Sequence, residues 1–349
     1  RDSVWYDSIR VVPYTHYTPD DVVLLAFLED GQERHLLKSV YADPFSFTFY
    51  FTAPSDSTPV IKGLNFDESS LVTDASVHND TVTYWVKDTA LLARQDTLSF
   101  ILTYQETDTL GQLVERMDTL DLSPKTTYAK IQAERNKTIE AWEKDRERRE
   151  KKAKKPLPHE ENPYRRVWLE GGFKPSGGLD PNQNMRYLAK EPVLSVDSTK
   201  LHFYLQKDTN WLPAPYLFLP DENSSKTYTL YAEWEPGCKY RFVMDTAAVV
   251  SVLGHESKYS KQEFRVRAND EFGSIFIHVI SPDTGVVVQL LDRSDKVVAK
   301  ERADKDGNAD FFYMKPGEYF MRCFVDANGN GQWDTGEYAT GRQPEKVYY

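Results

Sequence analysis

Cysteine is scarce in this chain. Only Cys238 and Cys323 occur among its 349 residues, and both fall in strand-like segments that are far apart in the sequence. A disulfide framework is therefore excluded. Two buried free thiols are the favoured interpretation, and a single bridge between them stays open as the alternative.

Long apolar runs are also missing. No run approaches the roughly 18 residues that a membrane-spanning helix needs, and no signal peptide is visible. The chain begins at Arg1 rather than at a methionine. We therefore expect a processed or partial chain, with any targeting segment or lipid-bearing cysteine lying upstream of it.

An excess of positive charge is absent as well. The formal net charge is −11, so the chain as a whole repels phosphate backbones and nucleic acid is an unexpected partner. Hydrophobic residues make up 40% of the chain and aromatic residues 13%. That is enough apolar material for packed cores, which excludes wholesale disorder.

Catalytic signatures are missing too. The seven histidines are scattered, and no nucleophile elbow, P-loop or dinucleotide fingerprint occurs. Carboxylate pairs such as Asp20–Asp21 and Glu160–Glu161 lie in polar turns, where nothing would raise a pKa for acid catalysis. We expect no enzyme. A hydrolase with dispersed carboxylates stays as a third hypothesis, which a cleft with two facing acids would support.

What the chain does contain is a series of strand signals. Residues 22–28 form an apolar run that ends at a turn, and residues 45–51 alternate so that four aromatic side chains share one face. Residues 81–86 and 97–104 follow the same alternation. Short strands separated by polar turns predict a β-sandwich over residues 1–122.

A charged segment interrupts this pattern. Ser123 followed by Pro124 predicts a helix N-cap and first position, and residues 127–155 are nearly all good helix formers. Beyond Trp142 the segment has no apolar face, so it cannot bury itself. We expect a solvated helical linker over residues 123–164, which is ended by prolines.

Strand signals then resume in two further groups. They predict a second β-sandwich over residues 165–270 and a smaller one over residues 271–349; the resemblance given below implies that the first is Ig-like and the second transthyretin-like. The expected fold class is therefore mainly β, with tandem sandwich modules and one charged linker helix.

The loop at residues 326–337 is the strongest motif. Its oxygen-bearing side chains recur at the spacing of a 12-residue calcium loop, with glycine at the sixth position for the sharp turn. The predicted ligands, with a backbone carbonyl from Gln332, are Asp326, Asn328, Asn330, Gln332, Asp334 and Glu337.

Strand-like segments, not helices, flank this loop. A calcium ion there would rigidify the module structurally, and its affinity would be modest because carboxylates are few. The alternative is a hairpin loop rich in asparagine and glycine for turn reasons alone. A weaker acidic loop at residues 304–308 suits a tight turn better than a metal.

Three segments of the chain resemble a known domain. Residues 192–201 (PVLSVDSTKL), 239–248 (KYRFVMDTAA) and 271–275 (EFGSI) look like the S-layer-type bacterial Ig-like domain of secreted proteins and lipoproteins of the Bacteroidota. The charged helix and the final strand–loop–strand unit also resemble these lipoproteins, and the final unit is similar to transthyretin-like modules.

This resemblance implies a lipid-anchored envelope protein at the outer membrane or cell surface, and it carries over no catalytic residue. We expect a non-catalytic scaffold or partner in an envelope protein assembly, which touches the membrane only through an upstream anchor. The alternative is a glycan-binding surface module that uses exposed aromatics such as Trp211 and Trp234. Burial of those rings would argue against it.

Overall fold

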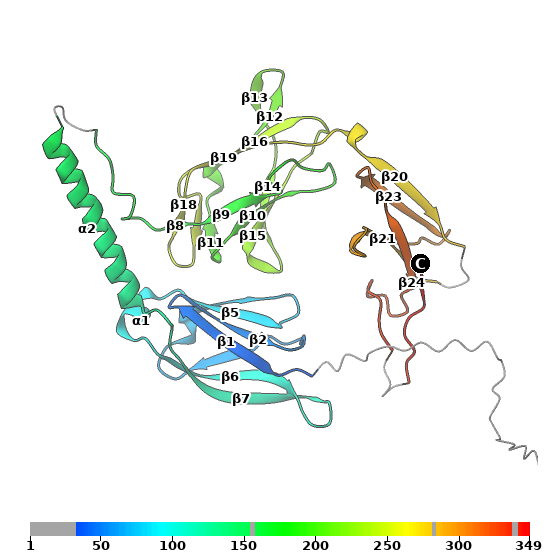
Figure 1. The fold of residues 1–349 in the computed structure, drawn as a ribbon, viewed down its shortest axis with the longest axis horizontal. Helices are drawn as coiled ribbons and strands as arrows, with labels where there is room; N and C mark the ends of the chain where they lie inside the picture. The colour runs from blue at the N-terminus through cyan, green and yellow to red at the C-terminus, as the bar shows by residue number, and fades with distance from the viewer. Residues whose placement is uncertain (1–32, 154–157, 281–283, 337–340) are drawn as a thin grey trace, which may run out of the picture. The chain divides into compact units, whose positions relative to one another are not determined.

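A computed structural model describes residues 33–153, 158–280, 284–336 and 341–349. The fold is mainly β, as predicted, and the described chain forms two compact units. The larger unit runs to Ile275 and includes Phe312–Pro316, and the smaller unit takes the remaining residues from Phe276 onward (Figure 1). The predicted strand at residues 22–28 lies outside the described residues.

A first sandwich opens the larger unit. One sheet has the order β1-β2-β5-β4 and the other β3-β6-β7. Two short helices, η1 (Glu68–Ser70) and α1 (Thr89–Arg94), join strands of this sandwich. The strands are β1 (Leu36–Asp43), β2 (Ser46–Phe51), β3 (Val60–Gly63), β4 (Leu71–Ala75), β5 (Thr81–Val86), β6 (Leu98–Thr107) and β7 (Leu113–Leu122).

The core of the first sandwich confirms the predicted alternation. Phe47 and Phe49 of β2 are fully buried, whereas the residues that alternate with them, Ser46, Thr48 and Tyr50, are half-buried. Phe47 stacks on Tyr84 of β5 and on Phe100 of the facing sheet, with ring centroids 5.4 and 5.6 Å apart. Such ring pairs add to the stabilisation that burial of their area provides.

Arg34 is buried at the entry to this sandwich, with 1% of its surface exposed. Its guanidinium donates to the carbonyl oxygens of Gln105 (3.1 Å), Asn79 (2.9 Å) and Ala53, and it lies 4.1 Å from the ring centre of Phe51. One side chain therefore ties together three segments of backbone whose carbonyl groups would otherwise lack donors.

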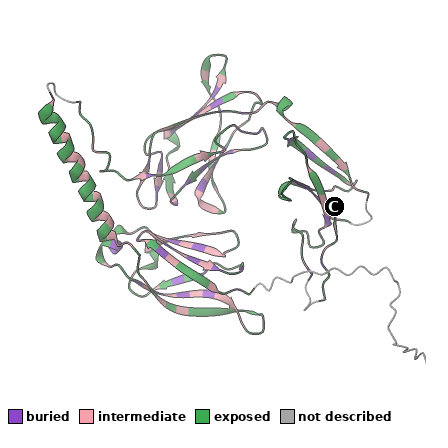
Figure 2. Cartoon of the chain, viewed as in Figure 1, coloured by how far each residue is buried: buried purple, intermediate pink, exposed green. Residues whose placement is uncertain are grey.

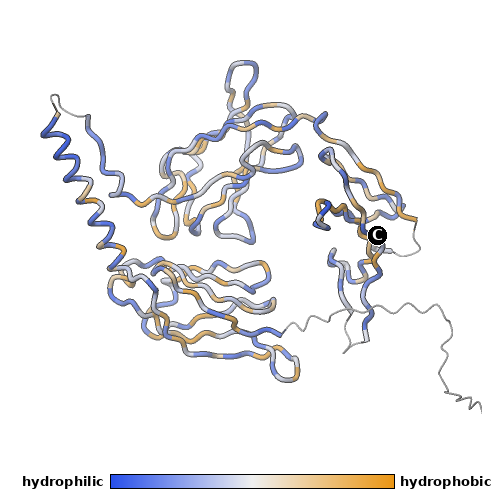
Figure 3. Tube along the Cα trace, viewed as in Figure 1, coloured by the Kyte–Doolittle hydropathy of each residue, from blue (hydrophilic) through white to orange (hydrophobic). Residues whose placement is uncertain are grey.

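Helix α2 (Tyr128–Lys152) follows, and its start corrects the sequence prediction. The N-cap is Thr127, whose hydroxyl accepts from Lys130 N–H, and not Ser123. The reason is tertiary: the Lys125 and Thr126 N–H groups donate to carbonyls of β1, which keeps these residues out of the helix up to Thr127. No residue of α2 is buried (Figure 2), and its C-terminal half is hydrophilic (Figure 3), as predicted.

The return segment at residues 158–166 runs back along α2. Arg135 donates to the carbonyl oxygens of Tyr164 and Arg165, and Asn162 donates to the Ile139 carbonyl. Further along, Arg146 of the helix donates to the carbonyls of residues 158 and 160. The helix that cannot bury itself is thus held by polar contacts with its own return segment.

A second sandwich has sheets ordered β14-β15-β10-β9, β11-β17-β18-β8 and β13-β12-β16-β19. The short 3₁₀ turns are η2 (Ser198–Lys200) and η3 (Asn269–Glu271). The strands are β8 (Trp168–Leu169), β9 (Gly171–Lys174), β10 (Met185–Ala189), β11 (Val193–Val196), β12 (Leu201–Lys207), β13 (Asn210–Pro213), β14 (Leu217–Asp221), β15 (Ser224–Tyr231), β16 (Lys239–Met244), β17 (Val249–Ser251), β18 (Glu256–Ser257) and β19 (Ser260–Arg265).

Aromatic rings also fill the second core. Phe203 of β12 stacks on Tyr240 of β16 at 5.4 Å, and Phe242 packs edge-on against Phe173 of β9. Rings from the sheets that contain β9 and β16 therefore interlock across the sandwich. Along β12 and β16, buried residues alternate with half-exposed ones.

The chain from Gly273 forms two more sheets, with the orders β20-β23 and β22-β21-β24-β25. Their strands are β20 (Gly273–His278), β21 (Val286–Leu291), β22 (Val297–Arg302), β23 (Asn308–Met314), β24 (Phe320–Val325) and β25 (Val347–Tyr348). Every residue of β21 is buried. The predicted division of the chain into four parts stays a prediction.

The buried arginine allows a direct test of the first sandwich. We expect Arg34→Met to lower the free energy of unfolding by about 3 kcal/mol, because three carbonyl groups lose their donor. Urea unfolding measures this change. The matched control is Arg94→Met at an exposed position of α1, which we expect to change stability little. Equal effects of the two substitutions would contradict the assignment.

Candidate functional site

The predicted calcium loop leaves β24 directly. Asp326 N–H donates to the Gly285 carbonyl, and Val325 N–H donates to the Lys346 carbonyl. The residues that enter and leave the loop are therefore bonded to the sheet. Glu345 N–H donates to the Asp334 carbonyl across the loop base. The loop is therefore a connection between two paired strands, as its flanks predicted.

The first predicted ligand, Asp326, is the buried anchor of this loop. Its carboxylate accepts from the N–H groups of Gly329 (2.7 Å) and Gly331 (2.8 Å) and forms an ion pair with Arg302 of β22. Gly331 takes a positive φ of 72°, where glycine is favoured. The sixth-position glycine thus turns its N–H back to the first residue of the loop.

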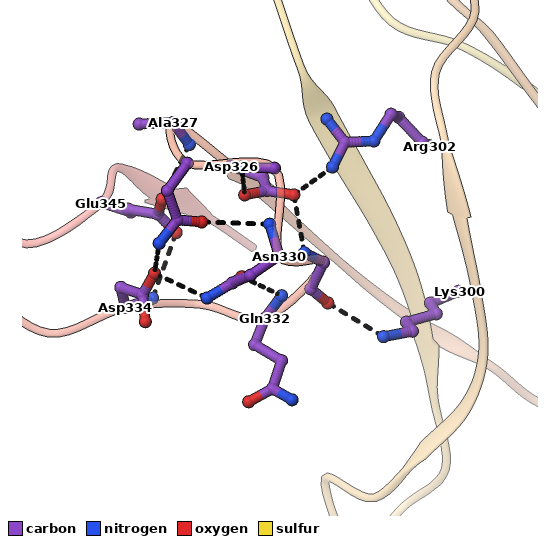
Figure 4. A network of polar contacts seen from close by, with 11 residues as sticks. Lys300, Arg302, Asp326, Ala327, Asn330, Gln332, Asp334 and Glu345 are labelled. Atoms are coloured by element: carbon purple, nitrogen blue, oxygen red, sulfur yellow. Dashed lines mark hydrogen bonds and ion pairs between the residues drawn. The ribbon is translucent and has the colours of Figure 1, made fainter. Parts of the chain in front are cut away.

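Asn328, Asn330 and Asp334 converge in the structure, and Figure 4 labels the last two of them. The side-chain amides of both asparagines donate to the same carboxylate oxygen of Asp334, over 2.5 and 3.0 Å. Their Oδ1 atoms accept backbone N–H groups two residues further on. A half-turn of each amide would present its oxygen, in place of its nitrogen, to the space beside Asp334.

The other two predicted ligands differ from these. The Gln332 side chain points away from the convergent groups (Figure 4), which leaves its backbone carbonyl as the predicted donor. Glu337 lies outside the described residues.

Glu345 is a loop partner that the sequence did not reveal. Its carboxylate accepts from the N–H groups of Ala327 (2.7 Å) and Asp334 (3.1 Å). The Trp333 indole also donates to the backbone carbonyl of Glu345. Glu345 lies outside the twelve-residue pattern and arrives through the pairing of β25 with β24, so no local spacing could have identified it.

The donor set fits a hard cation, because amide and carboxylate oxygens are the ligands that calcium prefers. Two cationic side chains of β22 oppose it: Arg302 pairs with Asp326, and Lys300 donates to the Gly331 carbonyl at 2.9 Å. No group of three or more histidine, cysteine, aspartate or glutamate residues is clustered for a metal in the described part of the chain. A cation here would rely largely on amide and carbonyl oxygens.

The weaker acidic loop is a turn. Asp304 accepts from the N–H groups of Asp306 (2.9 Å) and Asn308 (2.8 Å), which is the Asx pattern of a tight turn. Its carboxylate oxygens are used for this local purpose. This agrees with the predicted preference for a turn over a metal.

The two tryptophans proposed for glycan stacking do not form a platform. The Arg241 guanidinium covers one face of Trp211, 3.9 Å from its ring centre. Trp234 packs edge-on against Phe203 and Tyr240 in the second core, and its indole donates to Asn184. Both rings are half-buried and engaged in packing, and glycan binding by them stays a prediction.

Other polar groups also have local partners. Cys238 and Cys323 are free thiols, both half-buried. Burial is the main cause that raises the pKa of each thiol, so neither resembles an activated nucleophile.

Two histidines have carboxylate partners: His202 pairs with Asp245, and His255 pairs with Glu191. No helix in the described ranges is long and apolar enough to cross a membrane.

No protein-family model and no curated protein matches this chain. Among solved structures it is similar to a segment of native alpha-2-macroglobulin from Escherichia coli spanning domains MG0-NIE-MG1, with 11% identity, a TM-score of 0.26 and coverage of 86% of this chain and 95% of that one. It is also similar to the N-terminal part of the bacterial S-layer protein SbsC, with 12% identity, a TM-score of 0.26 and coverage of 47% and 42%.

A third similar structure is the BSP domain of a biofilm-associated protein, with 9% identity, a TM-score of 0.19 and coverage of 87% and 66%. Likenesses of this size carry no argument about what the chain does. The assignment to a mainly β class rests on the sheets themselves.

Asp326 gives a pH-dependent prediction. Burial alone would raise its pKa, but the N–H groups of Gly331 and Gly329 and the Arg302 guanidinium outweigh burial, so the pKa is lowered. The carboxylate therefore stabilises the fold above its unfolded pKa of about 3.9, and this contribution is lost as pH falls through the folded value.

We expect Asp326→Asn to lower the melting temperature at neutral pH, with the gap to the parent closing as pH falls below about 4. Thermal melts at a series of pH values, followed by circular dichroism, measure the gap. Asp306→Asn, at an exposed turn position, serves as the control. A gap for Asp326→Asn that does not change with pH would show that its charge is not stabilising.

Proposed function

We propose that this chain is a non-catalytic part of a bacterial envelope protein that works outside the cytoplasm, where it acts as a scaffold or partner in a protein assembly. The observation that carries this proposal is the character of the site at residues 326–336. It joins two strands, and the side-chain amides of Asn328 and Asn330 both donate to one carboxylate oxygen of Asp334. Cross-links of this kind hold a loop in shape, which suits a structural module.

The electrostatics of the described carboxylates support the same proposal. Those with a clear shift, such as Glu143, Asp197 and Glu263, have a lowered pKa, and the largest cause is a hydrogen bond from Arg165, Thr199 or Lys261. A general acid needs the opposite shift. These carboxylates are held in the ionised form by neighbours that stabilise the surface.

The location belongs to the proposal too. The resemblance to Bacteroidota Ig-like lipoproteins supports an outer-membrane or cell-surface position, held by a lipid anchor upstream of this chain. Tandem sandwich modules with a solvated helix suit such a setting, because each sandwich of the larger unit has its own aromatic core.

Calcium is the second element of the proposal. Asn328, Asn330, Asp334 and the Gln332 carbonyl would hold it, with Asp326 and Glu337 as further oxygen donors. The ion would supply charge that locks the loop between β24 and β25. The two opposing cations from β22 place the expected affinity in the range of extracellular modules, with a dissociation constant of about 10⁻⁴ to 10⁻³ M.

The calcium proposal predicts a ligand-dependent melt. At about 10 mM calcium we expect roughly 1.4 to 2.7 kcal/mol of stabilisation of the smaller unit, which raises its melting temperature by roughly 6 to 20 °C. Differential scanning calorimetry with calcium or with EDTA measures this. Asp334→Ala should abolish the shift, whereas Asp304→Asn in the neighbouring turn should preserve it. If both variants respond as the parent does, the loop is a turn only.

The scaffold proposal predicts a location and a set of partners. We expect the full-length protein, tagged at its C-terminus in the organism that encodes it, to fractionate with membranes and to crosslink to other envelope proteins. A tagged periplasmic protein without these modules is the control. Recovery in the cytosolic fraction, or turnover of a glycan or ester substrate by the purified protein, would refute the proposal.

A further inference from the structure

A slot opens along one side of the second sandwich, between β9 and β19. β8 and β18 pair in parallel at Trp168 and Glu256, and a second parallel pairing joins Leu179 to Val266 further along both segments. Between these two points the segments separate, and β9 and β19 are each the last strand of their own sheet. The groove between them has a volume of about 1030 Å³ and is lined by both strands.

Hydrogen-bond alternation identifies the backbone groups of β9 that face the slot. Lys190 N–H donates to the Glu170 carbonyl at 2.9 Å, and the register continues with Gly172 opposite Leu188. Because bonded and outward-facing residues alternate along an antiparallel strand, the N–H and C=O groups of Gly171 and Phe173 point away from β10.

The same reasoning applies to β19. Val266 N–H donates to the Cys238 carbonyl, so the N–H and C=O groups of Lys261, Glu263 and Arg265 point away from β16. Leu179 N–H donates to the Arg265 carbonyl at 3.0 Å, as this alternation requires. Both edge strands therefore carry outward-facing backbone groups on this side of the sandwich, of which the Arg265 carbonyl is already bonded to Leu179. β19 lines the groove itself through Ser260 and Gln262.

β9 carries two glycines, Gly171 and Gly172, so no side chain projects from these positions of the edge strand. A Cβ atom at Gly171 would lie 2.4 Å from the Tyr187 hydroxyl, so only glycine lets the strand lie against that ring. A Cβ at Gly172 would meet no atom within 4 Å. On the opposite border, the buried Ser260 hydroxyl has no hydrogen-bond partner among the described residues.

The slot is cationic in a chain that is acidic as a whole. One carboxylate, Glu170, lines it and pairs with Lys190, and Glu256 at the end of the slot pairs with Arg166 at 3.9 Å. Lys258 and Arg166 lie over the ring of Trp168, each at 5.8 Å. The cationic side chains of its lining are Arg135, Arg166, Lys174, Lys190 and Lys258.

We propose that this slot binds an extended acidic peptide from a partner protein, which adds as a strand between β9 and β19. Its backbone would take up the outward-facing groups of both edges, at the usual strand spacing of about 4.8 Å from each. Its acidic side chains would meet the five cations, and its apolar side chains would face Phe173 and Trp168. This inference rests on the proposed role as an assembly partner and names the partner's chemistry.

The test uses a defined probe: a fluorescein-labelled octapeptide of alternating valine and glutamate with blocked ends. Fluorescence anisotropy with the purified chain should show saturable binding. Replacing glutamate by lysine should abolish it. N-methylation of alternate peptide bonds, which removes donors and keeps the charge, should weaken binding at least tenfold.

Variants of the chain locate the site. Lys174→Glu combined with Lys258→Glu should weaken binding at least tenfold, because both are exposed cations of the slot. The matched control, Lys207→Glu combined with Lys239→Glu, reverses two exposed cations of the same sandwich outside the slot. It should leave binding within about twofold. Hydrogen exchange should slow in β9 and β19 when the peptide is bound.

Three outcomes would overturn the proposal. They are absence of saturable binding, equal binding of the N-methylated peptide, and equal binding of an acidic oligosaccharide, which has no peptide N–H groups. Self-association of the chain that the slot variant abolishes would instead assign the slot to a second copy and would also overturn it. If the slot fails while membrane location and envelope crosslinks persist, the scaffold role stands and only this site is wrong.

Discussion

Aromatic rings packed between facing sheets hold each sandwich of the larger unit together. Phe47 bridges Tyr84 and Phe100 in the first core, and Phe242 of β16 packs against Phe173 of β9 across the second. Because side chains alternate along a strand, committing one face to rings leaves the other face polar and leaves the backbone at sheet edges as the main unused bonding capacity. The slot and the loop at residues 326–336 both lie where strands stop pairing.

Much of this arrangement could be predicted from sequence. The alternation at residues 45–51 predicted which rings are buried, since period-two patterning is a local property that tertiary structure rarely overrides. The charged segment predicted a solvated helix, because it has no apolar face to bury. The spacing of Asn328, Asn330 and Asp334 predicted that their side chains converge, because a tight loop with glycine at its sixth position brings alternate residues together.

The features that escaped prediction depend on distant parts of the chain. The helix begins at Thr127 and not after Ser123, because β1 takes the N–H groups of Lys125 and Thr126. Glu345 reaches the loop only through pairing of β25 with β24. The cations of the slot come from α2, the return segment and both sandwich edges, so no window of sequence shows them as a cluster.

The return segment along α2 has a mechanical consequence. The chain travels out along the helix and back again, so Arg135 near one end contacts Tyr164 and Arg165 near the other. Under tension along the chain, we expect the exposed polar contacts of this pair to open one after another before either aromatic core unfolds. Full extension of residues 128–166 would lengthen the chain by roughly 130 Å. The hairpin would thereby relieve tension between the two sandwiches while their cores stay folded.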